Sequence, residues 1–121
     1  MGNPFVHCEL LSADVDKAKS FYGTLFDWTL EDISGVGGAA YTLIKIDERT
    51  GGGMMQNPMP GKPSGWIPYV LVENLEEAAA KAKALGATII KGRMEVPDRG
   101  SFYLIADPNG AMMGLWECKK A

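Results

Sequence analysis

The sequence predicts an α+β fold made of two βαβββ modules, and three observations support this prediction. First, the chain has 121 residues, enough for one domain or for two small halves that share a core. Second, hydrophobic residues make up 46% and charged residues 22%, as in a globular protein. Third, a pattern of one strand, one amphipathic helix and three strands occurs twice. When Val15 is placed against Leu75, Ala18 also falls against Ala78, which indicates a duplicated module.

The first module spans residues 1–56 and begins with a β-rich run at residues 5–11. Residues 12–14 follow as the expected start of a helix. The next apolar side chains recur at helical spacing on one face, namely Val15, Ala18, Tyr22 and Leu25. Three further strands complete this module, at residues 28–33, 40–46 and 53–56.

A linker at residues 57–65 separates the modules, because its three prolines and two glycines disfavour both helix and central strand. The second module spans residues 66–121. Its helix is expected to begin after Asn74, with Glu77 at the spacing of a capping box, and to end at Gly86. Its four strands are expected at residues 66–72, 88–91, 101–106 and 112–117.

Charge and terminal sequence restrict the location and the partners. Lys and Arg total 12 against 15 Asp and Glu, so a nucleic-acid-binding protein is not expected. The apolar runs are too short to span a membrane, and no secretory signal is visible at the start of the chain. Cys8 and Cys118 form no CxxC motif and are expected to be buried, reduced thiols. We therefore expect a cytoplasmic protein that binds neither nucleic acid nor membrane.

Several short motifs occur in a characteristic order. They are His7 in the first strand, the segments 14–16, 21–22 and 26–28 in the first module, and the segments 74–76, 85–86 and 106–110 in the second. With these elements the chain resembles the vicinal oxygen chelate superfamily of glyoxalases, bleomycin-resistance proteins and extradiol dioxygenases. The resemblance implies that each module curls into an incomplete barrel, and that either the two cavities or one shared cleft holds a small-molecule ligand. It also implies that the protein is a homodimer.

The resemblance also implies four inward strand positions that carry ligands in metal-using members. In this chain they fall on His7, Gly53, Ile67 and Gly114. Only His7 can bind a metal, whereas a catalytic ion needs two or three protein ligands. Three carboxylates, those of Glu9, Glu95 and Glu117, could also contribute a metal ligand. Glu117 lies three residues after Gly114, so in an alternating strand its side chain points to the opposite face. We therefore expect no metal and no other cofactor, and open volume beside the two glycines.

His7 is the candidate acid or base, since imidazole titrates near neutral pH; the other interpretation is a histidine that only satisfies a backbone group. Tyr69 and Tyr103 are candidate hydrogen-bond donors in catalysis. The candidate substrate-binding residues are Met54, Trp66, Ile67, Met112, Gly114, Trp116 and Arg93. Arg93 is assigned to a charged loop that either lies over the cleft or is simply solvated.

These residues predict a protein that binds a small organic molecule in a partly apolar cleft without metal. Lyase or isomerase chemistry next to a carbonyl is the enzymatic form of this hypothesis. One alternative is a protein that sequesters a drug or metabolite, as the bleomycin-resistance members do. The other is a metal-dependent enzyme of the lactoylglutathione lyase type, whose ligands lie elsewhere in the sequence.

Overall fold

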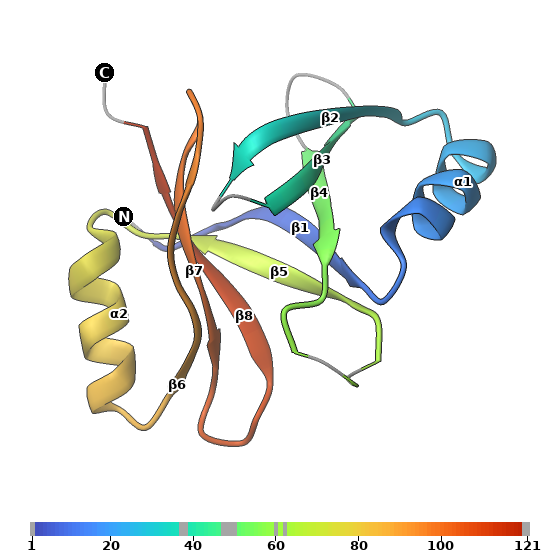
Figure 1. Cartoon of the computed structure of the whole chain (residues 1–121). Coiled ribbons are helices and arrows are strands. Elements are labelled where there is room, and N and C mark those ends of the chain that lie inside the picture. The colour runs from blue at the N-terminus through green and yellow to red at the C-terminus, as the bar shows by residue number, and fades with distance from the viewer. Residues whose placement is uncertain (1, 37–38, 47–50, 60, 62, 120–121) are drawn as a thin grey trace. The chain divides into compact units, whose positions relative to one another are not determined.

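The structure is a computed structural model that describes residues 2–36, 39–46, 51–59, 61 and 63–119 (Figure 1). The elements of the first module are β1 (Phe5–Ser12), α1 (Val15–Leu25), β2 (Thr29–Val36), β3 (Ala39–Lys45) and β4 (Gly51–Gln56). Those of the second are β5 (Gly65–Leu71), α2 (Leu75–Ala84), β6 (Thr88–Val96), β7 (Gly100–Ala106) and β8 (Met112–Cys118). The predicted α+β class with two βαβββ modules is confirmed.

The chain forms two compact units, His7–Ile67 and Met1–Val6 with Pro68–Ala121. The start of the chain belongs to the second unit because it is hydrogen-bonded there. The Leu71 backbone N–H donates to the Pro4 carbonyl at 2.9 Å, and the Asn3 side-chain amide donates to the Leu71 carbonyl at 2.9 Å. The two units are described separately below.

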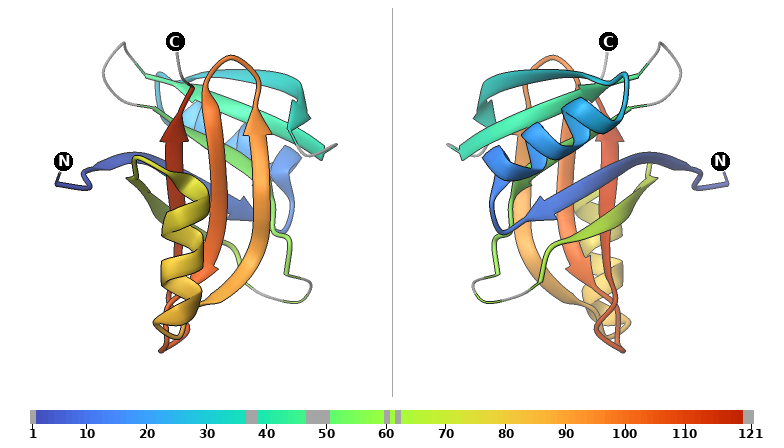
Figure 2. Two further views of the ribbon diagram at one scale, coloured as in Figure 1. Left: turned by 90° about the vertical axis from the view of Figure 1, so that its left-hand side faces the viewer. Right: turned by 90° about the vertical axis from the view of Figure 1, so that its right-hand side faces the viewer.

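The sheet of the unit His7–Ile67 has the strand order β2-β3-β4-β1, in which β1 and β4 are parallel and the other pairs are antiparallel. Helix α1 begins directly after the predicted start at residues 12–14, and Asp14 Oδ1 caps it by accepting a hydrogen bond from the Lys17 N–H at 3.1 Å. The helix lies on one face of this sheet (Figure 2). The core on that face consists of Leu10, Ile44 and Met54, with Val15, Ala18, Tyr22, Trp28 and Leu30 packed against it.

The second unit repeats this topology with the order β5-β8-β7-β6, in which β5 and β8 are parallel. Helix α2 is capped by Asn74, whose Oδ1 accepts from the Glu77 N–H at 3.0 Å. It ends before Gly86, whose φ of +104° is the left-handed conformation that favours glycine. Helix α2 covers one face of its sheet, over a core of Leu75, Ile105 and Leu115 (Figure 2).

Two predictions from sequence are wrong in detail. Strand β6 continues to Val96, so Arg93 and Glu95 lie in a strand and not in a charged loop. The strand is longer because Met94 and Val96 are buried and pair with β7. Cys8 and Cys118 are both exposed, and not buried as expected. Among the described residues, no helix has the length and apolar character needed to cross a membrane.

Candidate functional site

Three polar side chains meet in the unit His7–Ile67, and we call them the His7–Tyr41–Glu9 cluster. Alternation along β1 places His7 and Glu9 on the opposite face of the strand from Leu10, which packs beneath α1. Tyr41 comes from β3, and its Oη donates a hydrogen bond to Glu9 Oε1. His7 Nε2 lies 3.2 Å from Tyr41 Oη and 3.5 Å from Glu9 Oε1.

Burial differs sharply within this cluster. Glu9 is fully buried and Tyr41 is 4% exposed, whereas the His7 side chain retains 18% of its exposure. A buried carboxyl group is costly unless it is hydrogen-bonded, and Tyr41 supplies one such bond. His7 is therefore the member of the cluster that a small molecule can reach, and the other two lie behind it.

The two strand glycines are covered by tyrosine side chains, so the prediction of open volume beside them is wrong. A Cβ built on Gly53 would collide with the hydroxyl end of Tyr41, and one built on Gly114 would lie 2.5 Å from the ring of Tyr69. Tyr41 occupies this place because β3 pairs with β4, and Tyr69 because it is directly opposite Gly114 in the β5–β8 ladder. No sequence signal pointed to Tyr41, since its position depends on strand pairing.

The donor set does not fit the metal ion that the resemblance implies. His7 and Glu9 supply two ligand-type side chains, fewer than the three that catalytic sites generally use. At the two glycine positions, tyrosine atoms fill the space into which a carboxylate side chain would extend. Within the described part of the chain, no group of three His, Cys, Asp or Glu side chains is arranged to hold a metal.

The second module has apolar and aromatic residues where the first has this cluster. In the register that places Val15 against Leu75, His7 corresponds to Ile67 and Glu9 to Tyr69. Ile67 is buried, and Tyr69 is 1% exposed. Acid–base chemistry at these equivalent positions is thus restricted to the first module.

Tyr41 also has an aromatic counterpart in the second module. Leu43 pairs with Gly53 in the first module as Leu104 pairs with Gly114 in the second, and Tyr41 and Phe102 each lie two residues earlier. The Tyr69 and Phe102 rings form a T-shaped pair with centroids 5.4 Å apart. Trp116 stacks on Phe102 at 6.3 Å, so the predicted residues Tyr69, Gly114 and Trp116 do come together.

Two other predicted ligand contacts lie on the helix-covered face of the first unit. Met54 is fully buried in the core beneath α1. The Trp66 indole N–H donates to Tyr22 Oη at 3.2 Å, and its ring lies 6.1 Å from that of Trp28. Met112 begins β8 opposite Ala106 and is half-buried.

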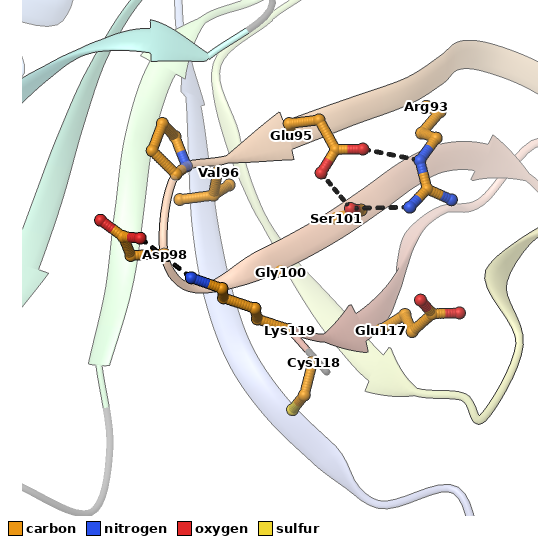
Figure 3. Close-up of a pocket in the computed structure, with 10 residues that line it drawn as sticks. Arg93, Glu95, Val96, Asp98, Gly100, Ser101, Glu117, Cys118 and Lys119 are labelled. Atoms are coloured by element: carbon orange, nitrogen blue, oxygen red, sulfur yellow. Dashed lines mark hydrogen bonds and ion pairs between the residues drawn. The ribbon is translucent and has the colours of Figure 1, made fainter. Parts of the chain in front are cut away.

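Arg93 and Tyr103 meet on the face of the second sheet that carries α2. Arg93 donates to Glu76 at 3.0 Å, to Glu95 at 2.7 Å and to Ser101 at 3.1 Å, and Tyr103 Oη donates to Glu76 at 2.7 Å. Figure 3 shows Arg93 joined to Glu95 and Ser101. These three residues line part of a pocket with a volume of about 320 Å³. Arg93 therefore already binds two carboxylates of its own chain.

These hydrogen bonds shift the pKa values of the groups involved. The Tyr103 hydroxyl, and then Arg93, lower the pKa of Glu76. Ser101, and then Arg93, lower the pKa of Glu95. The pKa of Tyr103 is raised because its proton is bound by Glu76. The network holds both glutamates in their ionised form and ties α2 to its sheet.

The repeated module, with a helix on one sheet face and an inward polar or aromatic pair on the other, defines a class of duplicated βαβββ proteins. Residues 5–115 match the Glyoxalase/Bleomycin resistance protein/Dioxygenase superfamily. The chain belongs to this superfamily, as its sequence motifs predicted.

Two curated relatives are longer proteins. The chain is 34% identical over 107 residues to "Putative glyoxylase CFP32" of Mycobacterium bovis, covering 88% of this chain and 41% of the relative. It is 25% identical over 122 residues to the anthracycline biosynthesis protein DauV of a Streptomyces species, covering 89% of this chain and 44% of the relative. The chain thus spans about two fifths of the length of these relatives.

Similar solved structures include two methylmalonyl-CoA epimerases. The Mycobacterium tuberculosis enzyme has a TM-score of 0.65 at 14% identity and covers 96% of this chain and 88% of its own. The Streptomyces coelicolor enzyme, in complex with 2-nitronate-propionyl-CoA, has a TM-score of 0.68 at 11% identity and covers 98% of this chain and 96% of its own. At these identities the likeness concerns the fold.

Proposed function

We propose that this protein binds a small organic molecule next to the His7–Tyr41–Glu9 cluster without a metal, and that His7 exchanges a proton with it. The observation that carries this proposal is a buried carboxyl and phenol, hydrogen-bonded to each other, directly behind a histidine that remains accessible. The reaction would be an isomerisation or a lyase-type elimination next to a carbonyl group.

The chemistry of the cluster suits proton transfer. A neutral imidazole can accept a proton near physiological pH, and a general base must lie within hydrogen-bond reach of the proton that it removes. A carbonyl on the ligand acidifies an adjacent C–H bond, because the electron pair left behind is delocalised onto the carbonyl oxygen. Ile67 stays a proposed apolar contact in the unit of this cluster, and Tyr69, Met112 and Trp116 stay proposed ligand-binding residues of the other unit. Tyr103 is not proposed as a donor to a ligand beside His7, because it lies on the α2 face and its hydroxyl donates to Glu76.

The relatives support this class of reaction through what their names state. CFP32 is named a glyoxylase, DauV is named an anthracycline biosynthesis protein, and the Streptomyces coelicolor epimerase structure is a complex with 2-nitronate-propionyl-CoA. Each of these names concerns a small organic molecule, and the epimerases are isomerases. Because the relatives are more than twice as long, we extend only the general chemistry to this chain.

A sequestering protein is the second candidate function, because the described residues of the second module place aromatic rings at the positions equivalent to the cluster. Substitution of His7 separates the two functions. His7→Ala should abolish turnover in an enzyme and leave ligand affinity nearly intact in a sequestering protein. Cys8→Ala is the matched control, since Cys8 is the next residue of the same strand and faces the other way.

The experiment begins with a thermal-shift screen of small carbonyl compounds and aromatic natural products, followed by an assay of each stabilising ligand for turnover. Stabilisation by a carbonyl compound with His7-dependent turnover supports the proposal. Stabilisation without turnover supports sequestration. A metal-dependent lactoylglutathione lyase would instead give stoichiometric metal and an upward shift with Zn²⁺ or Ni²⁺, which would refute the metal-free site.

We further propose that the protein acts as a cytoplasmic homodimer. Helix α1 supports the dimer, because it has no fully buried residue and its apolar side chains Phe21 and Leu25 are 59% and 57% exposed. Such side chains on a small protein often mark an interface. Sedimentation velocity tests this, with Phe21→Ser expected to shift the population toward monomer.

A further inference from the structure

The geometry points to Glu9 and Tyr41 as positioning residues that fix the tautomer of His7. They place the imidazole proton on Nε2 and the lone pair on Nδ1, so that Nδ1 is the atom that takes a proton from the ligand. This inference rests on the proposed role of His7, but the tautomer can be measured without knowing the ligand.

The direction of the hydrogen bonds carries the inference. A tyrosine hydroxyl has one proton to donate, and Tyr41 Oη donates it to Glu9 Oε1. In the 3.2 Å contact between Tyr41 Oη and His7 Nε2, the imidazole N–H must therefore be the donor. Glu9 Oε1 lies 3.5 Å from the same nitrogen and attracts the same proton. In a neutral imidazole the other nitrogen, Nδ1, then carries the lone pair.

The second module shows that the fold does not require a carboxyl group at this place. At the position equivalent to Glu9 it has Tyr69, which packs against Phe102 at the position equivalent to Tyr41. The two modules have the same strand order, so the same sheet forms with an aromatic pair in place of the carboxyl and the phenol. A buried carboxyl with a hydroxyl partner is generally no more stabilising than an apolar pair of similar volume. The first module thus has polar residues, Glu9 and Tyr41, in place of an apolar pair at the position where the His7 N–H needs an oriented acceptor.

The proton transfer that this arrangement allows is balanced. The C–H bond next to the ligand's carbonyl breaks, and an N–H bond forms at His7 Nδ1. The electron pair of the C–H bond moves onto the carbonyl oxygen, which becomes an enolate. His7 becomes an imidazolium, and the Nε2 proton remains directed at Tyr41 and Glu9. Return of the proton from His7 to another atom of the enolate gives an isomer, and departure of a leaving group with its electron pair from the adjacent carbon gives a lyase product. The substrate class is thus a carbonyl compound with an adjacent C–H.

The test is a long-range ¹H–¹⁵N correlation spectrum of uniformly ¹⁵N-labelled protein, at a pH where the ring is neutral. His7 is the only histidine in the chain, so its two ring nitrogens are assigned without ambiguity. The expected result is an Nε2 resonance of the protonated type and an Nδ1 resonance of the unprotonated type. The opposite pattern, or an average of the two tautomers, would overturn the inference even if no variant could be purified.

Two variants test the cause. Tyr41→Phe should move the ring toward a mixture of tautomers, because Nε2 loses its hydroxyl acceptor. Glu9→Leu should do the same, because the Tyr41 hydroxyl loses the carboxyl acceptor that takes its proton. Tyr22→Phe is the matched control: it removes another phenol of the same unit, one that accepts from Trp66, and should leave the spectrum of His7 unchanged. Unchanged tautomers in both cluster variants would refute the positioning role.

The outcomes for the tautomer and for the proposed function are distinguishable. The expected tautomer without any turnover in the ligand screen would refute the enzymatic function and leave the positioning of His7 intact. His7-dependent turnover with the proton on Nδ1 would refute the positioning role and leave the enzymatic function intact.

Discussion

Replacement of the Glu9–Tyr41 pair should show whether these two residues depend on each other for stability. Both side chains are buried, and the Tyr41 hydroxyl donates to the Glu9 carboxyl. Tyr41→Phe keeps the ring and removes this donor from a buried acceptor, which typically costs about 1–3 kcal/mol. Glu9→Leu leaves the Tyr41 hydroxyl without that acceptor and should cost a similar amount.

The double variant Glu9→Leu with Tyr41→Phe should lose less stability than the sum of the single variants. When both partners of a buried hydrogen bond become apolar, no polar group of the pair remains to be solvated, and the net cost can be close to zero. We expect a coupling energy of about 1–2 kcal/mol, within the range for residues in direct contact.

Urea unfolding measures these free energies. For a chain of this size the slope is on the order of 2 kcal/mol per molar urea, so a loss of 2 kcal/mol lowers the midpoint by roughly 1 M. Tyr22→Phe is again the control, and its exposed hydrogen bond predicts a change within about 0.5 kcal/mol. Strict additivity of the two cluster substitutions would show that the pair is not coupled and would refute the reasoning.

Three further predictions concern other parts of the molecule. Gly114→Ala should destabilise the protein by about 1–3 kcal/mol, since its Cβ would lie 2.5 Å from the Tyr69 ring; a normal urea midpoint would show that this ring moves freely. Arg93→Met should reduce the loss of stability on acidification: its two glutamate partners have lowered pKa values, so their stabilisation is present above their ordinary pKa of 4.5 and is lost as pH falls through the folded-state value. Unfolding curves at about pH 6 and pH 3 check this, and identical pH dependence in the variant would contradict it. Asn74→Ala should cost about 1 kcal/mol through loss of the α2 cap, with Asn74→Ser largely restoring stability.

Local signals were sufficient to predict the elements of the fold. Asn74 caps α2 as expected, and α1 starts after residues 12–14 as expected, because helix starts depend on atoms only a few residues apart. The linker with three prolines lies between β4 and β5, where it was predicted. The length of β6 was underestimated because its charged residues alternate with buried Met94 and Val96, and their burial depends on pairing with β7.

The candidate site was predicted only in part. His7 was identified from its residue type and its place in the first strand, and it does lie in the polar cluster. Glu9 was considered only as a metal ligand. Tyr41 was not considered, because it lies on a strand whose neighbours are known only after the sheet is assembled. The roles of Met54 and Arg93 as ligand contacts stay predictions, and the structure places both on helix-covered faces.

The sequence by itself determined that this chain is a duplicated βαβββ protein, because hydrophobic periodicity, caps and turns are encoded within short segments. It also showed that three of the four inherited metal positions lack a ligand, since that follows from residue type alone. Only the tertiary structure decided which side chains lie at these positions. The pairing of β3 with β4 brings the Tyr41 hydroxyl over Gly53, and β1 carries Glu9 and His7 to it. Such contacts join residues more than 30 positions apart, and no local rule of spacing encodes them.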